Sequence, residues 1–108
     1  MAGNLSGGEQ QILEMAMVLA AGPRLQLLDE PSLGLSPANQ QLVFATVRGI
    51  RDQGVTVLMV EQNATAALRI SDRAIVMELG RKSTEGPADG ILEDAAIRAA
   101  YLGDVGKS

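Results

Sequence analysis

Two adjacent carboxylates, Asp29 and Glu30, end a short apolar run that begins at Leu25. Such a run predicts a strand, and ligands of open α/β sheets bind at the carboxyl ends of strands. Because neighbouring strand residues face opposite sides, we expect the two acids to have different tasks. One can hold Mg²⁺, which takes few protein carboxylates and keeps several waters, while the other faces a water molecule. Taken alone, an acidic pair before Pro31 indicates no more than the end of a strand.

A second group, Ser6, Gly7, Gly8 and Glu9, lies at the start of an amphipathic helix predicted at about residues 9–21. Ser6 and Glu9 have the spacing of a capping box, so a well-capped helix is the simplest interpretation. Glycines in the first turn, however, cost about 1 kcal/mol each relative to alanine. Bare backbone at a helix N-terminus lets an anion such as phosphate approach the amides. We therefore favour an anion contact here.

The elements that carry these residues alternate between strand and helix. Ser36 and Pro37 have the residue types of an N-cap and a first helical position, and Gly54 ends the helix that they begin. A β-branched apolar run at residues 55–60 predicts a second strand. Strand, helix and strand in this order form a βαβ crossover, hence a parallel sheet that we expect to be buried on both faces.

The rest of the chain predicts a short helix, a hairpin and a helical end. The helix is expected at residues 64–70, the first hairpin strand at 73–77 and its partner at about 81–84, with the turn at Gly80. Pro87 opens a terminal helical region that ends near Tyr101.

Composition narrows the possible functions of the 108 residues. The chain has no cysteine and no histidine, so thiolate or imidazole metal sites and histidine-based triads are excluded. Thirteen acidic and nine basic residues give a net charge of −4, the wrong sign for binding nucleic acid. The longest apolar run, residues 15–21, is far shorter than the roughly 20 residues that cross a bilayer, so we expect no direct membrane insertion.

Three motifs stand in a fixed order along the chain: Leu5-Ser6-Gly7-Gly8-Glu9-Gln10-Gln11, Leu28-Asp29-Glu30-Pro31 and Ser32-Leu33-Gly34-Leu35-Ser36. They closely resemble the signature motif, the Walker B motif and the D-loop of ABC transporter ATPases. With Glu61-Gln62-Asn63 and the ending Ala100-Tyr101-Leu102-Gly103, the chain is most similar to the ATP-binding subunits of branched-chain amino acid importers. The resemblance implies an α/β chain with an incomplete P-loop NTPase fold: a mainly parallel sheet with flanking helices and a C-terminal hairpin.

The resemblance also implies a role for each matching residue, with ATP and Mg²⁺ as cofactors. Asp29 corresponds to the carboxylate that supports Mg²⁺ through water, and Glu30 to the catalytic glutamate that orients or deprotonates the attacking water. Gln62 stands at the switch position, where most of the family has histidine, and would contact the γ-phosphate through its amide. The residues that would bind ATP held by the opposite subunit are Ser6, Gly7, Gly8 and Glu9.

Two positions depart from the family pattern. Ser36 lies where many relatives carry the D-loop aspartate, and Met17 where an arginine is common. The resemblance further implies that residues 1–108 are the C-terminal portion of one ATPase domain, with its phosphate-loop (Walker A) half absent. Gly106-Lys107-Ser108 mimics the end of such a loop, but Tyr101 stands where its first glycine belongs. We therefore expect the chain to be inactive by itself.

The implied partners are a second ATPase subunit, arranged head to tail, and transmembrane permease subunits. The implied location is the cytoplasmic face of the plasma (inner) membrane, on which the subunit is peripheral, and no nucleic acid is involved. Other duties stay open: lipid export, a soluble DNA-repair ATPase, or a non-catalytic fragment that acts only by dimerisation. The absence of a basic patch and of coiled-coil heptads argues against DNA repair.

Overall fold

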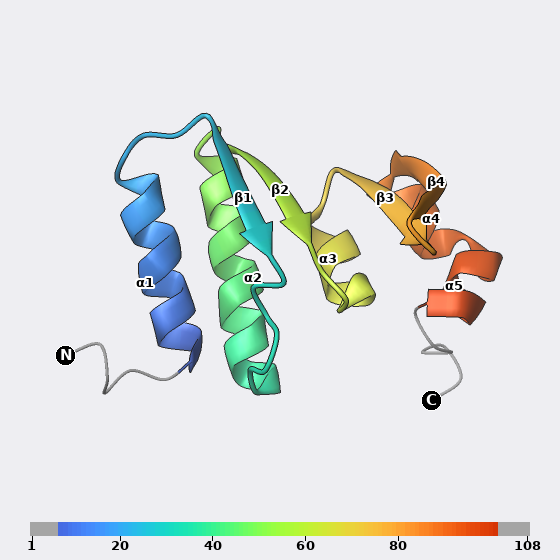
Figure 1. Ribbon diagram of the computed structural model, residues 1–108, viewed down its shortest axis with the longest axis horizontal. Helices are drawn as coiled ribbons and strands as arrows, with labels where there is room; N and C mark the ends of the chain where they lie inside the picture. Colours follow the sequence, from blue (N-terminus) through green and yellow to red (C-terminus); the bar gives the residue numbers. More distant parts are fainter. Residues whose placement is uncertain (1–6, 102–108) are drawn as a thin grey trace. The chain divides into compact units, whose positions relative to one another are not determined.

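The structure, a computed structural model, describes residues 7–101. The chain divides after Gln62 into two compact units, each of which is described by itself (Figure 1). The first contains α1 (Gly7–Leu19), β1 (Leu25–Asp29), α2 (Pro37–Asp52) and β2 (Thr56–Val60). The second contains α3 (Ala64–Ile70), β3 (Arg73–Glu78), β4 (Arg81–Pro87), α4 (Ala88–Glu93) and α5 (Ala95–Tyr101). The predicted α/β class is confirmed.

The first unit is built on a parallel pair of strands. β1 pairs with β2 from Leu25 opposite Thr56 to Asp29 opposite Val60, and α2 connects the two strands. The predicted crossover is therefore present. Because the two strands are parallel and in register to their last residues, their carboxyl ends lie side by side.

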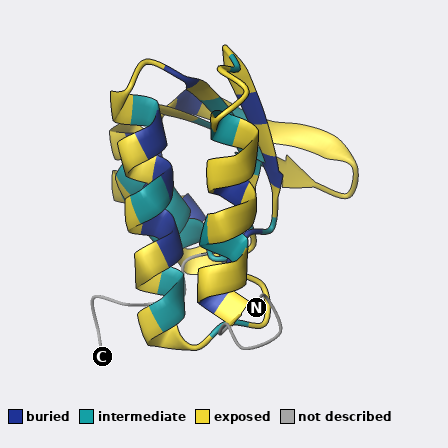
Figure 2. Ribbon diagram, turned by 90° about the vertical axis from the view of Figure 1, so that its left-hand side faces the viewer, coloured by how far each residue is buried: buried dark blue, intermediate teal, exposed yellow. Residues whose placement is uncertain are grey.

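The local sequence accounts for α2. The hydroxyl of Ser36 accepts a hydrogen bond from the backbone amide of Asn39 at 3.3 Å, and Pro37 occupies the first turn, as predicted. The chain leaves the helix through Gly54, whose φ of +95° favours glycine. Figure 2 shows a stripe of buried residues along the helix, which consists of Val43, Phe44, Val47 and Ile50. This stripe is the main core of the first unit.

The expectation that the parallel sheet is buried on both faces is wrong for the described residues. Gln26 and Leu28 of β1 are buried, but Leu27 is exposed to 66%. Its neighbour in β2, Leu58, is also exposed, to 59%. Side chains alternate along a strand, so this difference separates the two faces of the sheet. The described helices of the unit cover one face only, and the opposite face presents apolar side chains and Asp29.

The second unit is a hairpin with three short helices. β3 and β4 pair antiparallel around a turn at Leu79 and Gly80, both with positive φ. The predicted terminal helix is two helices, because Asp94 has extended backbone and its carboxylate caps α5. A small core is formed by Leu68, Ala88, Ile91 and Ile97. Among the described residues no helix is long and apolar enough to span a membrane.

Candidate nucleotide site

The described residues among the candidates from the sequence lie at one end of the first unit. Figure 1 shows the N-terminal ends of α1 and α2 at the same end as the carboxyl ends of β1 and β2. Gly7, Gly8 and Glu9 are the first described residues of α1, Asp29 is the last of β1, and Gln62 follows β2 by two positions. Ser6 lies outside the described residues. Two helix N-termini at one edge provide partial positive charge, which suits an anion.

Glu30 has an unusual backbone conformation. Its φ of +46° lies in the left-handed region, where a non-glycine residue carries a cost on the order of 1–3 kcal/mol. Two hydrogen bonds hold this conformation: the Glu30 amide donates to the Val60 carbonyl at 2.7 Å, and the Glu30 carbonyl accepts from the Leu33 amide at 3.1 Å. Glu30 therefore lies beyond the strand, and strand alternation does not set its direction relative to Asp29.

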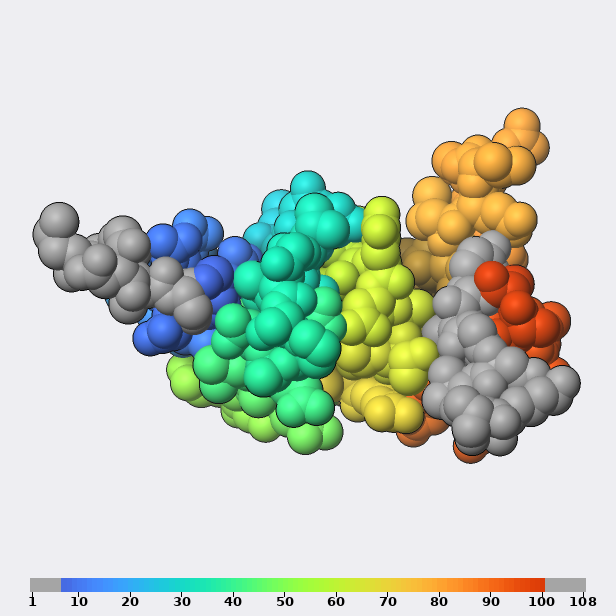
Figure 3. All heavy atoms as spheres, turned by 90° about the horizontal axis from the view of Figure 1, so that it is seen from below, coloured from blue at the N-terminus to red at the C-terminus, as the bar shows by residue number. Residues whose placement is uncertain are grey.

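The segment after β1 is tied to the segment after β2 through Glu61. One carboxylate oxygen of Glu61 accepts from the Ser32 amide at 3.3 Å, and the other accepts from the Gln62 amide at 3.1 Å. Ser32 is only 2% exposed. In Figure 3 the teal atoms of the turn after β1 lie beside the yellow-green atoms near residue 61. Glu61 was not among the residues predicted from the sequence, although its place after a parallel strand is a usable signal.

Packing between α1 and α2 explains why one of the two glycines at the start of α1 must be small. A Cβ atom on Gly8 would lie 2.8 Å from both Cβ and Cγ of Asn39 in α2, which is closer than real contacts allow. A Cβ atom on Gly7 would meet only the tip of the Leu35 side chain, at 2.8 Å. Gly8 is buried and Gly7 is exposed. The small size of Gly8 thus serves the contact with α2, and Gly7 is the glycine that a ligand can approach.

We expect Gly8→Ala to destabilise the chain by about 1–3 kcal/mol, the usual cost of overpacking, and Gly7→Ala to cost little because the Leu35 tip can move. Urea unfolding followed by circular dichroism measures both. In the Asn39→Gly background, which removes every opposing side-chain atom, the cost of Gly8→Ala should shrink most; in Asn39→Ala, which keeps the opposing Cβ, it should shrink less. Equal stability of the two alanine variants would contradict this packing.

A cavity of about 200 Å³ lies between α1 and β1 and reaches Asp29. Gln26 lines it and is buried, and its side-chain Oε1 has no hydrogen-bond partner. Among the described residues there is no cluster of three or more carboxylates that could hold a metal ion. A single carboxylate at a strand end is compatible with a Mg²⁺ ion whose other ligands are waters and phosphate oxygens. It is not compatible with a site in which protein side chains supply all the ligands.

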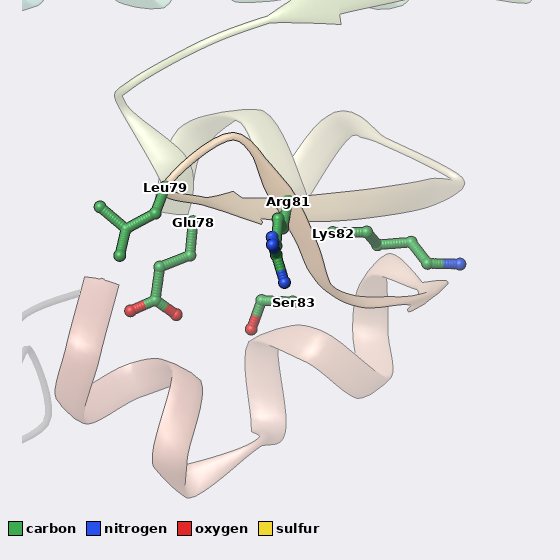
Figure 4. A pocket seen from close by; sticks show the side chains of 5 residues that line it. All are labelled: Glu78, Leu79, Arg81, Lys82 and Ser83. Atoms are coloured by element: carbon green, nitrogen blue, oxygen red, sulfur yellow. The ribbon is translucent and has the colours of Figure 1, made fainter.

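A second hollow, of about 360 Å³, lies at the hairpin turn (Figure 4). Its lining includes Leu79, which is 96% exposed, and Lys82, which forms a 3.0 Å ion pair with Glu85. It contains none of the residues that the sequence analysis selected. The strand ends of the first unit therefore remain the candidate site.

Comparison with known proteins identifies the chain. Residues 1–33 match the ABC transporter family. The high-affinity branched-chain amino acid transport ATP-binding protein BraG of Pseudomonas aeruginosa is 48% identical over 102 residues, 94% of this chain and 44% of that protein. The chain belongs to the ABC transporter ATP-binding family. Another relative, the lipopolysaccharide export system ATP-binding protein LptB of Acidithiobacillus ferridurans, is 38% identical over 101 residues, 94% of this chain and 42% of that protein.

Solved structures agree with this family. The ADP conformation of an ATP-binding cassette of an ABC transporter has a TM-score of 0.77 and 28% identity, and the match covers 94% of this chain and 42% of the cassette. The predicted partial P-loop NTPase fold is thereby confirmed. The chain spans less than half the length of the ABC transporter relatives that it matches.

Proposed function

We propose that the chain supplies the hydrolytic and signature segments of an ATPase subunit that energises an ABC transporter, with branched-chain amino acids as the transported class. The observation that carries the proposal is the register of β1 and β2, which puts the segments that carry Asp29, Glu30 and Gln62 side by side, at the end of the unit where α1 begins. Phosphoryl transfer depends on positioning and electrostatics more than on covalent chemistry, so a small set of well-placed polar groups can perform it.

Asp29 and Glu30 would have different roles, one in binding the metal ion and one in activating water. Asp29 is exposed at the end of β1 and would hold Mg²⁺ through water; when bound, the ion neutralises charge on the phosphates. Glu30, fixed by its bond to Val60, would orient the attacking water and accept its proton. The left-handed backbone and its two hydrogen bonds fix the place in the turn from which the Glu30 side chain extends.

Gln62 and the signature residues would complete two different nucleotide sites. Gln62, exposed after β2, would donate its side-chain amide to the γ-phosphate of ATP bound on its own subunit. Ser6, Gly7, Gly8 and Glu9 would face ATP held by a second ATPase subunit, where the N-terminus of α1 favours negative charge. This division requires a head-to-tail pair of ATPase subunits. The other partners would be transmembrane permease subunits, which the ATPase subunit would meet at the cytoplasmic face of the membrane.

Import of branched-chain amino acids is favoured over lipid export by the identities to BraG and to LptB, 48% against 38%. A chimera in which this chain replaces the aligned segment of BraG tests the choice. In cells that lack BraG, the chimera should restore uptake of radiolabelled leucine, whereas the corresponding chimera in LptB should fail to restore lipopolysaccharide export in cells depleted of LptB. The opposite pattern would assign the chain to export.

A further inference from the structure

We infer that Glu61 is a positioning residue: its carboxylate fixes the turn that follows Glu30 against the segment that carries Gln62. This inference rests on the function proposed above. Ser32 and Glu61 follow two different strands and lie 29 positions apart in the sequence. No feature of the sequence pattern assigned Glu61 this role.

The contact is made by one side chain and two backbone amides. Glu61 Oε2 accepts from the Ser32 amide at 3.3 Å, and Oε1 accepts from the Gln62 amide at 3.1 Å. A carboxylate has two equivalent acceptor oxygens, so it can serve both donors at once, and bonds from backbone amides to a charged acceptor are stronger than neutral ones. The bond to Ser32 is partly buried, so water competes less for it than at an open surface, whereas the bond to Gln62 is exposed.

The turn itself transmits the contact to Glu30. The Leu33 amide donates to the Glu30 carbonyl at 3.1 Å, and the Leu35 amide donates to the Ser32 carbonyl at 3.2 Å, so Glu30 and Ser32 belong to one hydrogen-bonded turn. Side-chain amide Nε2 of Gln40 also reaches the Ser32 carbonyl, at 3.5 Å. Ser32 is buried, and its position is therefore set from both its amide and its carbonyl. Loss of the Glu61 contact should loosen the turn that restrains Glu30 without breaking the β1–β2 pairing.

Glu61→Gln tests the inference, because glutamine keeps the shape but offers one acceptor oxygen and one donor group in place of two acceptors. Hydrogen exchange of the 108-residue chain, resolved to single amides, should show at least one of the Ser32 and Gln62 amides, the one that loses its acceptor, exchanging at least roughly tenfold faster. The Glu30 amide, bonded to Val60, should keep its rate. In the BraG chimera the same variant should lower kcat roughly tenfold with the KM for ATP unchanged, since the turn acts on the hydrolytic step.

Glu93→Gln on α4, an exposed glutamate, is the matched control and should change neither exchange nor kcat. Unchanged exchange at Ser32 and Gln62 in Glu61→Gln would overturn the inference, and so would equal acceleration of all amides, which indicates a general role in stability. A rise in KM with kcat unchanged would also overturn it. The exchange measurement needs no ATP, so it separates this inference from the proposed function, whose failure would show as an inactive unmutated chimera.

Discussion

Glu30→Gln in the BraG chimera should leave ATP binding intact and reduce steady-state hydrolysis by about 10²–10⁴-fold, the usual loss when a general base is removed. Glutamine has the size and shape of glutamate and the same side-chain branching, so it adopts the φ of +46° with no additional strain. The variant therefore changes the basic carboxylate and little else. Phosphate release at saturating MgATP, together with nucleotide binding by titration calorimetry, measures the two quantities separately.

Glu93→Gln in the same chimera controls for loss of a negative charge, because Glu93 is exposed and lies outside the first unit. It should hydrolyse ATP at the unmutated rate. If Glu30→Gln retained more than a tenth of the unmutated turnover, Glu30 would not be the base. Loss of ATP binding in Glu30→Gln would instead point to a role in holding the nucleotide.

The 108-residue chain alone should bind MgATP with a dissociation constant well above roughly 10 μM, which corresponds to about −7 kcal/mol. Its sequence offers no phosphate-cradling loop with a lysine, and the groups at the strand ends are carboxylates and an amide. Carboxylates repel phosphate unless a cation intervenes, so we expect these residues not to retain a nucleotide by themselves. Calorimetric titration of the chain measures this affinity. A saturable one-to-one isotherm tighter than 10 μM would contradict it.

The elements of the fold could be predicted because local signals mark them. Ser36 and Pro37 begin α2, and both the hydrogen bond to Ser36 and the buried stripe of α2 follow the pattern of the sequence. β1 begins at Leu25 as predicted for the same reason, since an apolar run that ends in acids is a local feature, but it ends at Asp29 and leaves Glu30 outside. The exposure of Leu27 and Leu58 could not be predicted, because burial depends on which surfaces pack against a strand.

The chemistry of the site could be predicted only in part. Asp29, Glu30 and Gln62 were selected from residue type and motif, and the register of β1 and β2 brings their strand ends together. The backbone conformation of Glu30 and the bridge made by Glu61 could not be predicted, since both depend on contacts between segments that are distant in the sequence. Likewise, two glycines in the first turn of a helix indicate that side chains are excluded there. The contact of Gly8 with Asn39, which only the structure shows, is one cause of that exclusion.

The central claim is that this chain brings the hydrolytic residues of an ABC transporter ATPase to one sheet edge. Its most direct test is the rate of phosphate release by the BraG chimera at saturating MgATP. We expect sustained turnover that is lost on Glu30→Gln. A folded chimera that binds ATP and releases phosphate no faster than that variant would contradict this claim.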